Sequence, residues 1–552
     1  SISGSFKVTG SQFIKPDTLL EQNKHFVLSY DEDTGQIFKM NTSSIEDGDL
    51  GNEVYRTGSK DSNIIPNKFG SFDNQGTNSV IASGNKNKID APIGCTFIGG
   101  GINSTASGDC SFIGAGQSLR ITSSAGFGDT AFSSIVGGNS NSIINGSKSS
   151  IVGGATSVIS ASDYNACNNF IGATQTSFIS AQFGFLGSGN ANKISGSGAT
   201  GTQYSAIVNG SGNHITGSGC SFIGSGLKNK INNTCNGFIG TGNCNSINNC
   251  FSFIGSGIRN LSDANLSVVV DGFQNTSSGE YSTIVNGACQ LASGGCTFIG
   301  SGVRNTASGA FSVVVGGICN NTFNACTFIG GGCFNIIDGG SLNNIVGGQR
   351  NQITSSATFN TSIVGGLRNT ASGACSFIGG GEKNFISSSL GTIAGGLSNK
   401  VCGYEGIQGC GNSILGGSFN TICAATGSLR ANNTISGGET NQILKFVHDS
   451  YIGGGTSNKI CGEGLCATQF QGRATRNAVI VGGRCNLICD KNGNARVSTI
   501  LGGQFNKIIQ CAVSTTPWCL GFYNTVVGGE FNCIIGGSTF TSGNTVAGGF
   551  GN

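Results

Sequence analysis

Apolar and polar positions return in one short phrase along most of the chain. The phrase reads Ser or Thr, two apolar residues, Gly-Gly, two variable residues, Asn, one variable residue and Ile, as in "SIVGGLRNT", Ser362–Thr370. A second version carries Phe in the apolar pair, as in "TFIGSGVRNT", Thr297–Thr306. About 27 copies, mostly 14 to 16 residues apart, run from Ser79 to the end of the sequence. Such a period is the signature of a repeat architecture.

The length of the period predicts a thin coil with two strands and two corners. The β-branched and aromatic pair favours a strand, and the Ile after the Asn begins a return strand. The Gly-Gly pair supplies a corner where φ can be positive, and the Asn tolerates left-handed conformations and can hydrogen-bond backbone. Because stacked strands lie about 4.8 Å apart, about 27 coils give a rod on the order of 130 Å long. We therefore predict an all-β parallel β-solenoid.

The two apolar residues of each first strand point to opposite sides, because neighbours alternate along a strand. One side fills the core of the coil, and the other forms a column rich in Phe. An exposed apolar column of this length marks an interface, so we predict a homo-oligomer in which copies of the chain cover it. The phenylalanines of this predicted ladder are Phe97, Phe112, Phe170, Phe222, Phe238, Phe253, Phe298, Phe328 and Phe377.

Many of the 23 cysteines lie inside the repeat. Six of them stand two residues before the Phe, and we expect them to act as small buried hydrophobic residues on the same face as the Phe: Cys95, Cys110, Cys220, Cys296, Cys326 and Cys375. Free buried thiols fit folding in a reducing cytoplasm. The better disulfide candidates are the later pairs Cys461 with Cys466 and Cys511 with Cys519.

The chain divides into three parts. Residues 1–76 lack the repeat and hold 11 of the 26 acidic but only 7 of the 29 basic residues. We interpret them as a small β-rich attachment region, with a short strand at its start and a β-hairpin over Lys24–Asn41. Residues 77–399 form the regular solenoid. Residues 400–552 form a solenoid with longer insertions between copies, and since the sequence stops within a copy, we expect the natural chain to continue.

Two sets of side chains are candidates for binding. The late insertions combine arginine and aromatic residues, the usual anchors at interfaces, and we predict receptor contacts at Arg473, Arg476, Trp518, Phe522 and Tyr523. The residue before the repeat's Asn is often basic and predicts a positive stripe that attracts anionic glycans. The alternative interpretation is a solvated edge that keeps rods soluble and apart. The stripe comprises Lys86, Lys228, Arg259, Arg304, Arg350, Arg368 and Lys383.

Composition and motifs argue against several other functions. The formal charge is +3, and no apolar run approaches the 18 residues of a membrane span. Aromatic residues do not interleave with the basic stripe, which argues against nucleic acid. Glycosidase chemistry needs two close carboxylates, and although Asp271 and Glu280 could lie in neighbouring coils, surface ions are the simpler interpretation. We expect no enzyme activity, no metal site and no cofactor.

The phrase "TFIGGGINSTASGDCSFIGAG", Thr96–Gly116, resembles the head repeat of trimeric autotransporter adhesins, as does "TASGACSFIGGGEKN", Thr370–Asn384. This resemblance implies a homotrimer of left-handed parallel β-rolls. The segments "SISGSFKVTGS" and "HFVLSYDEDTGQIFKMNTSSI" instead resemble tail-fibre and other structural proteins of marine tailed phages. That likeness implies a C-terminal folding chaperone that cleaves itself off.

These resemblances imply two functions. The first is a virion fibre or appendage on the virion surface, assembled in the host cytoplasm, that binds a virion base protein through residues 1–76 and a glycan or protein receptor on the host. The second is a bacterial surface adhesin of the autotransporter kind. A tailspike with glycan-degrading activity is third.

Overall fold

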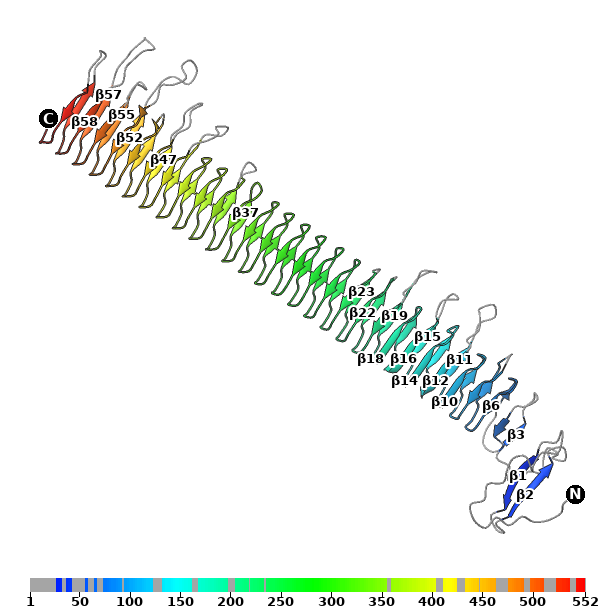
Figure 1. Cartoon of the computed structure of the whole chain (residues 1–552). Helices are drawn as coiled ribbons and strands as arrows, with labels where there is room; N and C mark the ends of the chain where they lie inside the picture. The colour runs from blue at the N-terminus through cyan, green and yellow to red at the C-terminus, as the bar shows by residue number, and fades with distance from the viewer. Residues whose placement is uncertain are drawn as a thin grey trace, which may run out of the picture.

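The computed structural model is an all-β rod built from stacked parallel coils (Figure 1). It describes residues 26–31, 36–41, 55–57 and 64–66 and, from 73 to 551, all residues except 92–93, 123–131, 161–166, 197–203, 218, 233–234, 355–358, 404–410, 424–431, 446, 463–474, 491–496, 511–522 and 537–542. Within these ranges no helix is long and apolar enough to cross a membrane. The prediction of a parallel β-solenoid is confirmed.

One coil shows how the repeat phrase folds. Strand β32, Phe298–Ile299, is followed by Gly300, Ser301 and Gly302, and the chain then bends at Arg304. Asn305 leads into the return strand β33, Thr306–Ala307, and a second bend brings the chain to the next coil, where β34, Val313–Val314, lies on β32. Each coil thus contributes one short strand to each of two parallel sheets.

We call these the first and second sheets. The first sheet stacks the Phe or Val strands of the coils, from β6 (Val80–Ile81) to β60 (Thr545–Val546). The second stacks the return strands, from β5 (Asp73–Asn74) to β59 (Cys533–Gly536). Each holds 27 parallel strands of solenoid coils within the described residues, which matches the number of repeat copies. Equivalent repeat positions lie directly above one another, as Phe298 lies beside Val313.

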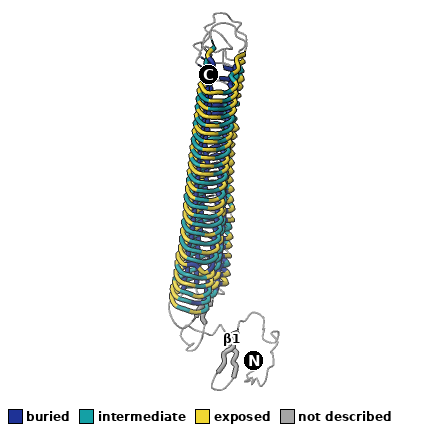
Figure 2. Tube along the Cα trace, turned by 90° about the vertical axis from the view of Figure 1, so that its left-hand side faces the viewer, coloured by how far each residue is buried: buried dark blue, intermediate teal, exposed yellow. Residues whose placement is uncertain are grey.

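The core is a double column of small and medium aliphatic side chains. The second residue of the apolar pair faces inward, and Ile299, Ile329 and Ile363 are fully buried. The return strands face them with residues such as Ala307 and Ile353. Figure 2 shows this buried interior along the rod, with exposed residues on the outside. The β-branched residues suit the short parallel strands that they occupy.

The repeat's Asn forms a buried ladder inside the corner between the two sheets. Asn305 donates from Nδ2 to the carbonyls of Ser301 and of Gly317 in the next coil, both at 3.0 Å. Its Oδ1 accepts the backbone N–H of Asn320, the next Asn of the ladder, at 2.9 Å. Each amide therefore satisfies buried backbone groups of two coils, and buried backbone groups need such partners. The prediction that the Asn contacts backbone is confirmed.

The left-handed conformation, however, belongs to the residues before the Asn, so that part of the prediction was wrong. Gly302 has φ of 108° and Arg304 has φ of 54°. A Cβ on Gly302 would lie 2.1 Å from the carbonyl oxygen of Gly317, so glycine is required at this position by close approach as well as by φ. We call this bend the first corner.

The bend after the second sheet, the second corner, also has a left-handed residue, such as Phe311 with φ of 57°. The longer insertions fall in this part of the sequence, between the second-sheet strand of one coil and the first-sheet strand of the next. They occur after β47 (Thr421–Cys423) and β52 (Lys459–Gly462), for example. The sequence between a first-sheet strand and the following second-sheet strand keeps a nearly constant length.

Two antiparallel strand pairs precede the regular coils. Strand β1, Phe26–Asp31, pairs with β2, Gln36–Asn41, which confirms the predicted hairpin strands. Strand β3, Tyr55–Thr57, pairs with β4, Ile64–Pro66, and β4 pairs in parallel with β6 at Ile64 and Val80. The first sheet therefore continues directly into residues that precede the repeat. The short strand expected at the start of the chain lies outside the described residues.

Candidate functional site

The outer side of the first sheet is an apolar band, which we call the outer strip. It consists, in each first-sheet strand, of the outward residue that directly precedes the buried core residue and the residue that directly follows it. Phe298, Phe328 and Phe377 are 36%, 37% and 39% exposed although Ile299, Ile329 and Ile378 are fully buried. The predicted opposite orientation of the pair is confirmed, and the chain itself leaves the Phe column uncovered.

The two positions of the outer strip depend on each other. In the eleven coils that carry Phe or Tyr at the first position, the second is always Gly, as in Phe298 and Gly300. In the other sixteen coils the second position is Val, Leu, Ala or Ser, as in Val313 and Val315. The sequence contains this dependence between the two positions, but it becomes visible only when the copies are compared with one another.

The structure gives the reason for the pairing. A Cβ on Gly300 would lie 3.5 Å from Cε1 of Phe298 and 2.4 Å from the carbonyl oxygen of Val315. The aromatic ring therefore extends across its own glycine, in the place that the Val side chain occupies in the other coils. Where aromatic coils follow one another the rings stack, with centroids 5.1 Å apart for Phe238 and Phe253. Apolar side-chain atoms, from Phe in some coils and from Val in others, thus lie at the same place of the outer strip in successive coils.

The outer side of the second sheet has a different character. Over its 27 strands, the two outward positions carry eleven Asp, Lys or Arg residues, whereas the outer strip carries none. Lys193 and Lys400 lie over the rings of Phe178 and Phe385, at 5.5 and 5.7 Å from the centroids. Charges and aromatic residues are thus mixed on this face, as is usual for a solvated surface.

Three basic residues follow one another on the second sheet. Strands β19 (Lys193–Ser195), β21 (His214–Thr216) and β23 (Lys230–Asn232) place Lys193, His214 and Lys230 in register. Partial burial and the two lysines lower the pKa of His214 below its usual 6.5. The ring Nε2 lies 3.3 Å from the hydroxyl of Ser195. Histidine is therefore held neutral between two cations near neutral pH.

The seven residues of the predicted basic stripe all occupy the left-handed position of the first corner, with φ between 53° and 57°. They are contiguous only at Arg350, Arg368 and Lys383, which follow one another in three successive coils. Elsewhere Cys, Gln, Phe and other residues interrupt them. Lys383 pairs with Glu382 at 2.9 Å, and Arg350 lies 5.6 Å from the ring centroid of Phe334. The stripe is thus a short basic patch with separate charges on either side.

The predicted receptor residues fall mostly outside the described residues, which include neither Arg473 nor Trp518 nor Phe522. Arg476 ends β53, Thr475–Arg476, whose partner is β50, Val447–His448. Tyr523 is 62% exposed and immediately precedes β58, Asn524–Val526. Both residues lie near the second corner, in coils whose first-sheet strands β54 (Val479–Ile480) and β58 are separated by β56 (Ser498–Ile500).

The prediction that six repeat cysteines are buried was wrong. Cys95, Cys220, Cys296 and Cys326 are exposed, and Cys110 and Cys375 are half-buried. Five of the six have positive φ at the second corner, namely Cys95, Cys110, Cys296, Cys326 and Cys375. Strand alternation does not extend into a left-handed bend, so these residues do not share the face of the Phe.

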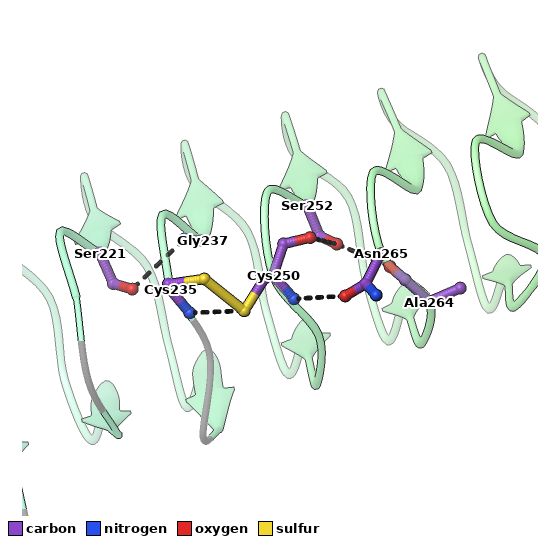
Figure 3. Close-up of a disulfide and its surroundings, with 7 residues drawn as sticks. All are labelled: Ser221, Cys235, Gly237, Cys250, Ser252, Ala264 and Asn265. Carbon is purple, nitrogen blue, oxygen red and sulfur yellow. Dashed lines mark hydrogen bonds between the residues drawn. A yellow bond between two sulfur atoms is a disulfide. The ribbon is translucent and has the colours of Figure 1, made fainter.

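Two disulfides join successive coils at positions that the sequence did not suggest. Cys235 is bonded to Cys250 at the second corner, where Cys250 N–H donates to Oδ1 of Asn265 in the following coil (Figure 3). The second disulfide joins Cys402 to Cys423. The sulfur of Cys461 lies 2.8 Å from that of Cys489 in the next coil. Cys466, Cys511 and Cys519 lie outside the described residues.

The acidic residues considered for catalysis lie at different corners. Asp271 follows the first-sheet strand β28, Val268–Val269, by two residues and accepts the N–H of Gly272 at 2.7 Å. Glu280 lies at the second corner, just before Tyr281 with its φ of 58°. In the part of the chain that the structure describes, no three His, Cys, Asp or Glu side chains are grouped so that they could hold a metal ion.

No family model matches the sequence, and no curated protein matches it at a significant level.

Proposed function

We propose that this chain is the structural rod of a virion fibre or appendage. In this proposal copies of the chain form a homotrimer, residues 1–76 bind a virion base protein, and the far end binds a glycan or protein on the host surface. The observation that carries the proposal is the division of one uniform rod into an uncharged outer strip, a charged second face and a corner that takes up the insertions. A rigid spacer needs a strong axis, a face for assembly and a place for recognition.

The same observations favour a mechanical role over catalysis. The core and the Asn ladder repeat in coil after coil, so the same backbone is supported along the rod. Stability in such a solenoid comes from contacts between neighbouring repeats. Variation is confined to insertions at the second corner, and binding residues on rigid scaffolds are often found on such segments. The proposed rod therefore acts without chemistry, and its late coils carry the host contact.

The short basic patch of Arg350, Arg368 and Lys383 supplies a second place for host contact. Stacked coils place these side chains at intervals of about 4.8 Å, and a linear anionic glycan could meet them in succession. We propose that the patch contributes to binding but does not select the receptor, because exposed charges raise association rates more than they give specificity.

Immunogold electron microscopy with an antibody against residues 77–399 tests the proposal. Labelling of fibres on purified virions is the expected result. Label on uninfected bacterial cells, with none on virions, would overturn the proposal in favour of a bacterial surface adhesin. Release of reducing sugar from host polysaccharide by the purified protein would overturn its non-enzymatic part and favour a tailspike.

A further inference from the structure

We propose that the outer strip is the face along which copies of this chain pack, parallel and in register, around an axis that runs along the rod. This inference rests on the proposed function, which requires assembly, and goes further by naming the face and the alignment. The occupant is a second copy of the chain, with a third completing the ring.

The absence of charge from the outer strip is the first support. In 27 successive coils neither of its two positions holds Asp, Glu, Lys or Arg, while the second sheet of the same coils holds eleven at its corresponding positions. Strands of both sheets place one inward residue between two outward positions and repeat once per coil, so this arrangement by itself does not require the difference in charge. Charge is depleted at the centres of protein interfaces, where it would lose its water.

The dependence between the two strip positions is the second support. Aromatic coils place a ring over their glycine, and most of the others place Val or Leu at that position, so the apolar bulk stays on one line. Val315, Val346 and Val364 continue this line and are 44%, 47% and 42% exposed in the single chain. Close packing against a neighbour requires such continuity, because voids at an interface lose contacts.

The dimensions of the strip identify a partner of the same kind. A surface that repeats at about 4.8 Å is matched over its length only by another stack of strands with that rise. A strip about 130 Å long and three residues, or about 10 Å, wide offers roughly 1,300 Å² per chain. This exceeds the roughly 800 Å² per partner of a stable interface. A second copy of this rod meets both conditions.

Polar residues within the strip indicate the register. Several non-aromatic coils have Ser, Thr or Asn where others have Phe, for example Asn344 and Ser362 in the coils between Phe328 and Phe377. In a parallel arrangement in register, polar levels meet polar levels and rings meet rings. A shifted or reversed copy would bury polar groups against rings, where they would lose their hydrogen bonds to water.

A charge-insertion experiment tests the face. One variant carries Val315→Lys, Val346→Lys and Val364→Lys on the outer strip. Its matched control carries Asn321→Lys, Gln352→Lys and Thr370→Lys, the outward second-sheet positions of the same three coils. Native mass spectrometry and sedimentation velocity give the oligomeric state of each, and circular dichroism reports folding.

We expect the wild-type protein and the control to share one oligomeric mass, and the strip variant to associate at least 100-fold more weakly while keeping its β spectrum. A strip variant with the wild-type mass and affinity would overturn the assignment of the face but leave the proposed fibre intact. A wild-type protein that is monomeric would overturn both.

Photocrosslinking tests the register even if the strip variant fails to fold. The crosslinker p-benzoylphenylalanine replaces Phe377, a conservative change of an aromatic side chain. Oligomers assembled from mixed ¹⁵N-labelled and unlabelled chains separate crosslinks between copies from those within one. We expect links between copies to fall on strip residues within one coil of Phe377. Links to second-sheet residues or to distant coils would overturn the proposed packing.

Discussion

The two sheets of the rod are equivalent inside and different outside. Both bury an inward residue in each strand, which is aliphatic in most strands, as with Ile345 and Ile353 in the same coil. Outward, the first sheet is free of charge over its whole length, while the second mixes lysines, aspartates and small polar residues. The core requirements therefore do not set the outer composition. The difference indicates that the two faces meet different surroundings, namely other copies of the chain and water.

The largest expected effect comes from truncating the buried aliphatic residues of the two sheets. Ile345→Ala and Ile353→Ala each remove a fully buried side chain, one from each sheet. We expect each to cost about 3 kcal/mol of local stability, because neighbouring coils cannot collapse into the cavity. Hydrogen exchange at the two adjoining coils measures the cost. Equal losses support the comparison, and a loss confined to one sheet would contradict it.

Two asparagines of one coil allow a comparison between the Asn ladder and the outer strip. Asn351 donates to the carbonyls of Gly347 and Gly366 at 3.0 Å and accepts the N–H of Asn369 at 3.0 Å. We expect Asn351→Ala to cost about 2 kcal/mol, since buried backbone groups lose their partners. Asn344→Ala on the outer strip is the control and should change local exchange in the isolated chain by less than about 0.5 kcal/mol.

Adjacent glycines in one coil distinguish the strip from its border. A Cβ on Gly330 would lie 2.4 Å from the carbonyl oxygen of Val346 and 3.3 Å from Cε1 of Phe328, while a Cβ on Gly331 meets nothing within 4 Å. We expect Gly330→Ala to destabilise the coil by about 1–2 kcal/mol through overpacking. Gly331→Ala should be neutral. Thermal unfolding of the two variants checks this, and equal melting temperatures would contradict the role given to the strip glycine.

The smallest expected effect is a pH dependence of the second face. Since the pKa of His214 is lowered in the folded chain, the fold disfavours its protonation. The stability that this provides is fully present above the unfolded value near 6.5 and is lost as the pH falls toward the folded pKa.

In the wild-type protein, the protection of amides around β21 relative to their intrinsic exchange rate should therefore be lower at pH 5 than at pH 7.5. In His214→Gln the change should disappear, and in Lys193→Met it should shrink because one of the two neighbouring cations is gone. If His214→Gln showed the same pH-dependent change as the wild-type protein, His214 would be excluded as the cause of that change.

Much of the architecture could be predicted because the same pattern of apolar, Gly and Asn residues occurs in every copy of the repeat. The inward Ile and outward Phe follow from strand alternation alone, and the short period predicts two strands per coil. The Asn was harder, because its preference for left-handed turns competes with its ability to satisfy buried carbonyls. In a coil stacked on others the second property prevails, and the bend moves to the preceding residue, such as Arg304.

The cysteine interpretation failed for a related reason. The alternation of strand residues was extended to a residue two positions before the strand, which lies in a left-handed corner where Cys296 and Cys326 are exposed. Disulfides between coils, such as that of Cys235 with Cys250, depend on which residues the stacking aligns. A single copy of the repeat does not contain that information. The residues of the basic stripe share one position of the first corner, but the continuity of the stripe depends on the order of the coils.

Hydroxyl-radical footprinting of the assembled protein tests the central claim most directly. Phe298 and Phe328 on the first sheet are 36% and 37% exposed in the single chain, and Phe323 on the second sheet is 47% exposed. We predict that assembly protects Phe298 and Phe328 at least tenfold while Phe323 is oxidised at the rate that its exposure implies. Oxidation of all three phenylalanines in proportion to their exposure in the single chain would contradict the account.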